Sequence, residues 1–357
     1  MAPRSKLPAP GSSARSALIV GITGQDGSYL AEHLLAGGYT VHGLVRRASM
    51  FNRSRIDHLR SGPNIPAGRL VLHYGDLTDR TSLRRLLKKI SPQEVYHLAG
   101  QSHVGLSFEI PEVTCEENAM ATLGLLEALR DLDYPVRFYL ASSSEVFGVP
   151  RASPQNEGTA FNPVNPYGCA KAFATQLCRV YRSAYGLFAC SGIAYNHESP
   201  RRGENFVTRK ITLGAARIKA GRQAVLTLGN LDARRDWGYA PEYVTAMAKM
   251  LQAKKPGDYV LATGQACSVR EFATAAFAEL GIGLKFKGKG AGETGRRTDT
   301  GAVIIQIDPK FYRPVESATL VGDATLAKTT LGWVPKTVGT DVARLMARSD
   351  AEQLASN

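Results

Sequence analysis

The first half of the chain alternates short apolar runs with longer segments in which apolar residues recur every three or four positions. The apolar runs predict buried strands at residues 17–21, 40–45, 70–74, 94–98, 137–141 and 188–195. The segments between them predict amphipathic helices at residues 28–36, 79–90, 114–132 and 166–185. Strands and helices that alternate in this way predict an α/β fold with a doubly wound parallel sheet of the Rossmann type.

The second half is less regular, because polar loops interrupt the pattern from Asn196 onward. A helix at 241–252 and a strand at 258–262 are expected to return to the first sheet, and helices are expected at 268–280, 324–331 and 338–355. The basic, glycine-rich stretch 287–297 is expected to be a loop. We therefore predict a flexible tail at 1–16, a Rossmann domain at 17–195 with a return at 239–263, and a smaller C-terminal substrate-binding lobe built from 196–238 and 264–357.

A glycine-rich turn, GITGQDG at residues 21–27, follows the first predicted strand and opens the next helix. Glycine permits a tight turn and lets backbone N–H groups approach a pyrophosphate at a helix N-terminus. The spacing alone is a weak signal, because glycines also occur in ordinary turns, but its place in the alternating pattern favours a dinucleotide site. The residues expected to contact the dinucleotide here are Gly21, Thr23, Gly24, Gln25, Asp26 and Gly27.

Basic residues end the second predicted strand, where an NAD-selective site usually has a carboxylate for the ribose 2′-hydroxyl. Arg46 and Arg47 stand there, and two guanidinium groups suit a 2′-phosphate better than a free diol. We therefore predict NADP as the cofactor, with a solvated basic loop as the alternative. Further cofactor contacts are expected from the ends of the third and fourth strands, at Asp76, Leu77, Leu98, Ala99 and Gln101, with Ser102 beside the substrate.

Tyr167 and Lys171 are four residues apart at the start of a predicted helix and therefore share a face. A neighbouring ammonium ion is expected to lower the pKa of the phenol, so that Tyr167 accepts a proton near neutral pH. Ser143, at the end of the fifth strand, completes the hydrogen-bond relay, and the set indicates nicotinamide chemistry on a hydroxyl or ketone. Glu145 adds a carboxylate that can remove a proton from a carbon beside a ketone, although a capping role is the alternative.

Composition narrows the class of protein. The 357 residues are 44% apolar and 21% charged, which excludes disordered, collagen-like and coiled-coil chains. No apolar run approaches the 18 residues or more of a membrane span, so we expect a soluble protein with no membrane partner. The five cysteines show neither CxxC nor metal-ligand spacing, which favours reduced thiols, a cytoplasmic location and no metal. The net charge of +13 suits an anionic partner.

Longer motifs resemble the GDP-mannose 4,6-dehydratases, a family of extended short-chain dehydrogenases/reductases. In the first half they are GITGQDGSY at 21–29, HGLVRR at 42–47, QSHV at 101–104 and SSSEVFG at 142–148. In the second half they are NHESPRRG at 196–203, NFVTRKI at 205–211, LGNLDARRDWG at 228–238 and RPVE at 313–316. The second-half motifs are the more specific ones, because many unrelated activities share the dinucleotide signature.

The resemblance implies a GDP-sugar substrate and tightly held NADP that is regenerated within each turnover. Tyr167, tuned by Lys171, would oxidise the sugar at C4 with support from Ser143. Glu145 would then take the C5 proton and help to expel the C6 hydroxyl, before hydride returns to C6. The resemblance also places His197 and Arg202 at the cofactor, and implies a homodimer or homotetramer. The residues that it places around the sugar nucleotide are Asn196, Asn205, Lys210, Arg235, Arg313 and Glu316.

Some positions depart from the family pattern. The family usually has Lys at Gly105, Tyr at Val113, Ala-Val at Gly168-Cys169 and Leu-Phe at Ala194-Tyr195. These departures leave open a bulkier substrate such as a GDP-manno-heptose. An epimerase or reductase on the same scaffold and a nonenzymatic NADP sensor also stay open as hypotheses. A nucleic-acid-binding protein is disfavoured, because the basic residues are scattered and form no recognised module.

Overall fold

The computed structural model describes residues 15–47, 52–60, 68–311 and 320–356. Seven strands form one parallel sheet in the order β10-β6-β5-β4-β1-β2-β3. The strands are β1 (Ser16–Val20), β2 (Thr40–Val45), β3 (Leu70–Tyr74), β4 (Glu94–His97), β5 (Arg137–Ser143), β6 (Phe188–Ala194) and β10 (Asp258–Leu261). This sheet confirms the predicted α/β fold of the Rossmann type.

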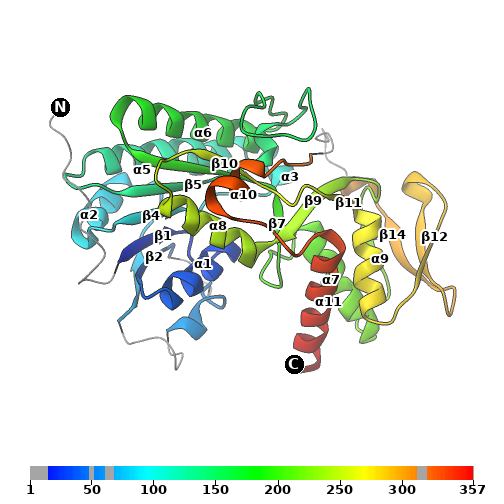
Figure 1. The fold of residues 1–357 in the computed structure, drawn as a ribbon. Coiled ribbons are helices and arrows are strands. Elements are labelled where there is room, and N and C mark those ends of the chain that lie inside the picture. Colours follow the sequence, from blue (N-terminus) through cyan, green and yellow to red (C-terminus); the bar gives the residue numbers. More distant parts are fainter. Residues whose placement is uncertain (1–14, 48–51, 61–67, 312–319, 357) are drawn as a thin grey trace.

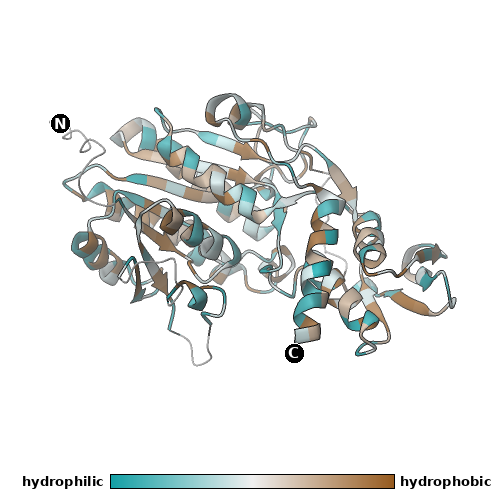
Figure 2. Cartoon of the chain, turned by 60° about the horizontal axis from the view of Figure 1, so that its bottom comes forward, coloured by the Kyte–Doolittle hydropathy of each residue, from teal (hydrophilic) through white to brown (hydrophobic). Residues whose placement is uncertain are grey.

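Helices cover both faces of the sheet (Figure 1). Alternate residues of β1 point to opposite faces, so Ala17 and Ile19 join one core while Leu18 and Val20 join another. The helices α1 (Gln25–Ala36) and α8 (Ala240–Gln252) pack on the first face. The other face is covered by α2 (Arg80–Ile90), α5 (Ala121–Arg130) and α6 (Pro166–Tyr185). Figure 2 shows apolar residues along the central strands and mixed polarity along the helices, as burial of one helix face requires.

The predicted helix at 114–132 is divided in the structure. It begins with α4 (Pro111–Cys115), continues through a π-helical turn, η2 (Glu116–Met120), and ends with α5. The short helices α3 (Val104–Ser107), η1 (Asp57–Leu59) and η3 (Ser144–Val146) complete this part of the chain.

Most of the remaining elements surround a second core, at the right of Figure 1. A three-stranded sheet joins β11 (Ala266–Ser268), β9 (Arg234–Tyr239) and β7 (Asn196–Glu198), and a four-stranded sheet joins β12 (Leu284–Lys287), β13 (Thr294–Arg297), β14 (Val303–Ile307) and β8 (Leu226–Leu228). The helices of this region are α7 (Val207–Lys219), α9 (Val269–Glu279) and α11 (Gly339–Ser356), with the short turns η4 (Gly290–Gly292) and η5 (Pro309–Phe311). The helix α10 (Thr325–Leu331) instead packs against the first core, beside α8 and β10.

Two expectations for this second half are wrong. The stretch 287–297 is not a loop between lobes, because it contains β13 and the turn that pairs β13 with β12. Leu284 and Phe286 pack against the second core while lysines alternate with them, and this basic character concealed the strand pattern. The 13-residue helix α7 also lies where polar loops were expected. The domain boundaries themselves stay a prediction.

Among the helices in the described part of the chain, none combines the length and apolarity needed to cross a membrane.

Candidate active site

The glycine-rich turn lies between β1 and α1 and is packed too tightly for side chains. Gly21 has φ +96°, and a Cβ on it would lie 2.8 Å from the backbone nitrogen of Ala99. A Cβ on Gly27 would lie 2.2 Å from the carbonyl oxygen of Gly21. Gly24 begins α1 with no side-chain cap, and its N–H donates to Gly21 O at 3.0 Å. The turn therefore leaves the N-terminal N–H groups of α1 without a side-chain cap, as a pyrophosphate site needs.

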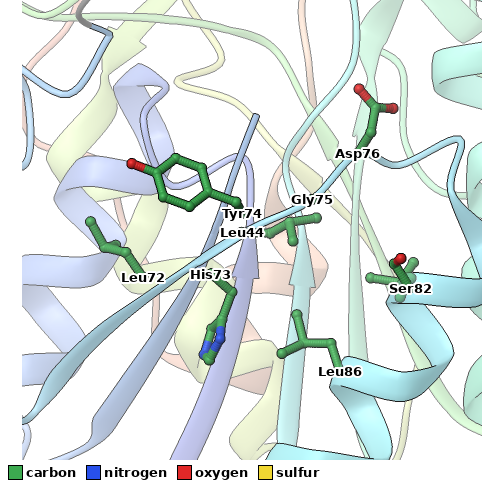
Figure 3. Close-up of a pocket in the computed structure, with 9 residues that line it drawn as sticks. Leu44, Leu72, His73, Tyr74, Gly75, Asp76, Ser82 and Leu86 are labelled. Atoms are coloured by element: carbon green, nitrogen blue, oxygen red, sulfur yellow. The ribbon is translucent and has the colours of Figure 1, made fainter. Parts of the chain in front are cut away.

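The residues expected around the adenosine half lie at the ends of β2 and β3. The Arg46 side chain is 70% exposed and pairs with Glu117 at 3.4 Å, and Arg47 is exposed. Asp76 lies at a separate hollow of about 300 Å³ between β3 and α2 (Figure 3). Its Oδ1 accepts hydrogen bonds from the backbone N–H and the hydroxyl of Thr78. Leu77 is buried in the core against α2.

A second, larger cavity of about 1010 Å³ lies between the carboxyl ends of the parallel strands and the second core. This is where ligands bind in open α/β sheets. The cavity brings together residues from both halves of the chain. The predicted site residues that line it are Asp26, Leu98, Ala99, Ser102, Ser143, Glu145, Tyr167, Lys171, Asn196, His197, Arg202, Asn205, Lys210 and Arg235.

Several other predicted residues in the described part of the chain do not line this cavity. Thr23 lies in the glycine-rich turn, where its carbonyl oxygen accepts a hydrogen bond from Arg55. The Gln101 backbone N–H donates to Glu117 Oε2, and the Gln101 side-chain amide donates to the carbonyl oxygen of His103. Arg313 and Glu316 lie outside the described residues. Three of the departures from the family pattern, Gly105, Ala194 and Tyr195, do line the cavity.

The four predicted catalytic side chains meet on one wall of the cavity. Ser143 ends β5, Glu145 follows in η3, and Tyr167 and Lys171 occupy the first turns of α6. The Glu145 N–H donates to Ser143 Oγ at 3.2 Å, and Lys171 Nζ donates to the carbonyl oxygen of Ala141 at 2.8 Å. Lys171 Nζ lies 5.8 Å from the centroid of the Tyr167 ring.

Burial changes the acid–base properties of this wall. Burial raises the pKa of Tyr167 to about 12, although a hydrogen bond with Ser143 acts in the opposite direction. The expected lowering of this pKa by Lys171 is therefore not found in the structure. Burial also lowers the pKa of Lys171 to about 8, because the charged ammonium form loses water. Desolvation is the main cause of both shifts.

A second polar cluster lies where α1 meets β7. His197 Nε2 lies 2.8 Å from Asp26 Oδ2, and His197 Nδ1 lies 2.7 Å from the carbonyl oxygen of Tyr195. Burial lowers the pKa of His197, but the Asp26 carboxylate outweighs that effect and raises the pKa above its usual value. Gln25 Nε2 donates to the carbonyl oxygen of His197 at 3.0 Å, so the glycine-rich turn is tied directly to the second half of the chain.

Several side chains at the site are not among the predicted residues. Asn165 is 3% exposed and donates from Nδ2 to Glu145 Oε2 at 2.8 Å. The Arg202 Cζ atom lies 3.7 Å from the centroid of the Phe206 ring, and Lys210 Nζ lies 3.6 Å from the centroid of the Phe311 ring. Asn followed by Pro is a typical helix-start signal, so the sequence could have identified Asn165 as the N-cap residue of α6. Phe206 lies within the motif NFVTRKI at 205–211, whereas no local signal marks Phe311.

The parallel sheet, the glycine-rich first turn and the Ser-Tyr-Lys set define an extended short-chain dehydrogenase/reductase. A sequence profile described as GDP-mannose 4,6 dehydratase matches residues 18–346, and the chain belongs to that family. The chain is 51% identical over 340 residues to GDP-mannose 4,6-dehydratase from Sinorhizobium fredii, covering 95% of this chain and 97% of that protein. It is 50% identical over 344 residues to GDP-mannose 4,6 dehydratase from Drosophila melanogaster, covering 96% and 87%.

A solved structure shares the fold. The dTDP-glucose 4,6-dehydratase from Streptomyces venezuelae superimposes with a TM-score of 0.78 at 23% identity, covering 96% of this chain and 98% of that one. The profile and the two relatives confirm the resemblance found in the motifs at the level of the family.

Proposed function

We propose that this enzyme removes water from GDP-mannose across C5 and C6 and gives GDP-4-keto-6-deoxymannose. The proposal rests on one observation: the cavity is lined by Ser143, Glu145, Tyr167 and Lys171 together. Oxidation of a hydroxyl needs one proton acceptor, whereas elimination needs a second acceptor at the neighbouring carbon. An alcohol dehydrogenase has no use for the additional carboxylate.

The residues of the glycine-rich turn fit a nicotinamide dinucleotide, because the contacts at Gly21 and Gly27 leave a side-chain-free cradle at the start of α1. When bound, such a cofactor would supply a hydride acceptor for C4 oxidation and a hydride donor for the reduction at C6. Gly21, Gly24 and Gly27 would hold the pyrophosphate, with His197 and Arg202 nearer the nicotinamide.

The cofactor is NADP rather than NAD in this proposal. The support is the pair of guanidinium groups at the end of β2, where Arg46 and Arg47 are exposed to a ligand. A measured affinity of the unmodified protein that is equal for NADP and NAD would contradict the choice.

Tyr167 takes the proton of the C4 hydroxyl, with Ser143 hydrogen-bonded to the same oxygen. Lys171 stays buried behind the ring and supplies positive charge while protonated. The new C4 ketone acidifies the C5 proton, and the Glu145 carboxylate removes it. The C5–C6 double bond then forms as the C6–O bond breaks, and the departing hydroxyl takes the proton held by Glu145 and leaves as water. The proton that Tyr167 took from the C4 hydroxyl is the one available for C5 as C6 is reduced, so both groups return to their starting states.

The substrate's nucleotide half is assigned to the opposite side of the cavity. Asn196, Asn205, Lys210 and Arg235 all line it, and the cationic members can neutralise a diphosphate. Arg313 and Glu316 would complete the nucleotide site, with the Glu316 carboxylate accepting from the guanine. This assignment makes the region around the second core a sugar-nucleotide-binding lobe.

A GDP-manno-heptose is the second candidate substrate. Gly105 and Ala194 line the cavity with almost no side-chain volume, which leaves room for a sugar with one more carbon. We further propose a cytoplasmic homodimer or homotetramer, for which light scattering of the active enzyme is the test.

Mass spectrometry of a GDP-mannose incubation tests the function. The product should be lighter by one water, with no external cofactor or reductant consumed, because hydride is returned within the turnover. A new product of unchanged mass would indicate an epimerase. A 4-keto-sugar reductase would leave GDP-mannose unconverted, because this sugar has no ketone to reduce. Parallel incubation with the GDP-heptose decides between the two sugars.

A further inference from the structure

Asn165 connects the two proton-transfer groups of the proposed reaction. It precedes α6 as the N-cap residue, and its side-chain Oδ1 accepts from the backbone N–H of Gly168 at 2.7 Å. Its Nδ2 donates at the same time to Glu145 Oε2 at 2.8 Å. One amide therefore joins the helix that carries Tyr167 and Lys171 to the carboxylate of Glu145.

The orientation of this amide is fixed by its partners. A rotated amide would bring Nδ2 against the Gly168 N–H and Oδ1 against the Glu145 carboxylate, so both contacts would become repulsive. Asn165 and Glu145 are 3% and 7% exposed, so water cannot readily replace the lost bond. Hydrogen bonds to a buried carboxylate are among the stronger ones in proteins.

Local packing reinforces the same arrangement. The first turn of α6 lies so close to η3 that a Cβ on Gly168 would be 2.6 Å from the Glu145 carbonyl oxygen. The Glu145 backbone is thus held by Gly168 and Ser143, while its flexible side chain is held by Asn165. The bond from Asn165 to Oε2 narrows the range of positions that the Glu145 carboxylate samples, and this narrowing is needed before the carboxylate can reach the C5 proton.

We propose that Asn165 is a positioning residue that aims the Glu145 carboxylate at the C5 proton. The inference rests on the proposed function, in which Glu145 is the C5 base. Asn165 does not itself exchange a proton with the sugar. Its loss should slow the elimination step and leave the C4 oxidation step nearly unchanged.

Asn165→Ser is the decisive variant, because serine also caps helices but has no donor that reaches Glu145. Asn165→Asp is the second variant: it keeps the size and the cap acceptor, but sets a carboxylate against Glu145. Asn162→Ser is the matched control, because Asn162 lies on the same loop, is exposed, and donates to the Val149 carbonyl oxygen.

The measurement uses GDP-mannose deuterated at C4 or at C5. Each Asn165 variant should lower kcat by about 10- to 100-fold, the loss expected when a reacting group is misplaced by about 1 Å. The isotope effect of C5 deuterium on kcat should rise, and that of C4 deuterium should approach unity. Asn162→Ser should leave kcat and both isotope effects unchanged.

The outcomes separate the two proposals. A merely structural role of Asn165 would slow both steps together and leave the ratio of the two isotope effects unaltered, and this result would overturn the inference. A wild-type kcat in Asn165→Ser would overturn it as well. If the unmodified enzyme released no water from either GDP-sugar, the proposed function would fail instead. If Glu145→Gln still exchanged C5 hydrogen at the normal rate, the assignment of the C5 base would be wrong, and the inference would fall with it.

Discussion

Tyr167 and Glu145 lie on the same wall of the cavity but act on different atoms of the sugar. Tyr167→Phe removes the acceptor of the C4 hydroxyl proton and should stop the reaction before the first hydride transfer. Glu145→Gln keeps the size of the side chain but removes its basicity, so oxidation at C4 should persist while water loss stalls. Each loss should be about 10²–10⁴-fold.

The two variants are told apart by exchange of the C5 hydrogen with deuterated solvent. Exchange should be lost in both variants, but only Glu145→Gln should still transfer hydrogen from C4. Circular dichroism of each variant controls for folding. Normal product formation by Glu145→Gln would show that another group removes the C5 proton.

Lys171 is held in the folded protein at an energetic cost. Its pKa is about 8 in the folded state against 10.5 for the free side chain, so the folded state disfavours the ammonium form. The cost is fully present below pH 8 and disappears as the pH rises towards 10.5, because the unfolded state binds more protons in that window. Lys171→Met should therefore raise the free energy of unfolding at pH 7 by about 1–3 kcal/mol, while it abolishes C4 oxidation.

Urea unfolding of the two proteins at several pH values measures this difference. Other titrating groups are common to both proteins, so the gap between them isolates Lys171. The gap should shrink between pH 8 and 10.5, and a gap that stays constant would contradict the prediction.

The local part of the site follows from the sequence, whereas its long-range part does not. Tyr167 and Lys171 share a helix face by spacing alone, and Ser143 and Glu145 are two residues apart. His197 and Asp26, by contrast, are separated by 171 positions, and only the folded chain brings them within 2.8 Å. The pKa of Tyr167 was mispredicted for a related reason, since burial depends on everything packed around the ring.

At the scale of elements, the contact between η3 and α6 sets the geometry of the catalytic wall. Gly168→Ala places a methyl group 2.6 Å from the Glu145 carbonyl oxygen, so one of the two elements must move. We expect a loss of about 1–3 kcal/mol in unfolding free energy, together with slower elimination. Cys169→Ala, at the next and exposed position, is the control. Equal kinetics in both variants would show that the contact has no catalytic effect.

Some of these elements could be predicted from the sequence, and others could not. The strands β2 and β3 are short, mainly apolar runs, and their predicted bounds coincide with those of the structure. The hairpin of β12 and β13 is covered on one side only, so lysines and glycines break its pattern. The helix α7 was missed because it follows polar, glycine-containing turns and begins with no side-chain cap.

At the scale of the whole molecule, the final helix is joined to the second core by a buried ion pair. Arg209 on α7 pairs with Asp350 on α11, and their side chains are 8% and 0% exposed. Burial lowers the pKa of Arg209 to about 10. Asp350→Asn leaves this cation without its counter-charge and should lower the free energy of unfolding by about 3–5 kcal/mol.

Replacing both Arg209 and Asp350 tests whether the unpaired charge causes this loss of stability. Arg209→Met combined with Asp350→Leu should recover most of the lost stability in urea unfolding, because no buried charge remains. A double variant as unstable as Asp350→Asn would show that packing, rather than the unpaired charge, accounts for the loss.

The position of β10 at the edge of the large sheet has a consequence for biosynthesis. β10 pairs with β6, yet the 67 residues from 195 to 261 must be translated after β6 before this partner is complete. At about 5–20 residues per second, the ribosome takes roughly 3–13 s to make them. During that interval the hydrogen-bonding edge of β6 is open to other nascent chains. Aggregation during expression should therefore depend on translation speed within this segment, and a chaperone that shields strand edges would act there.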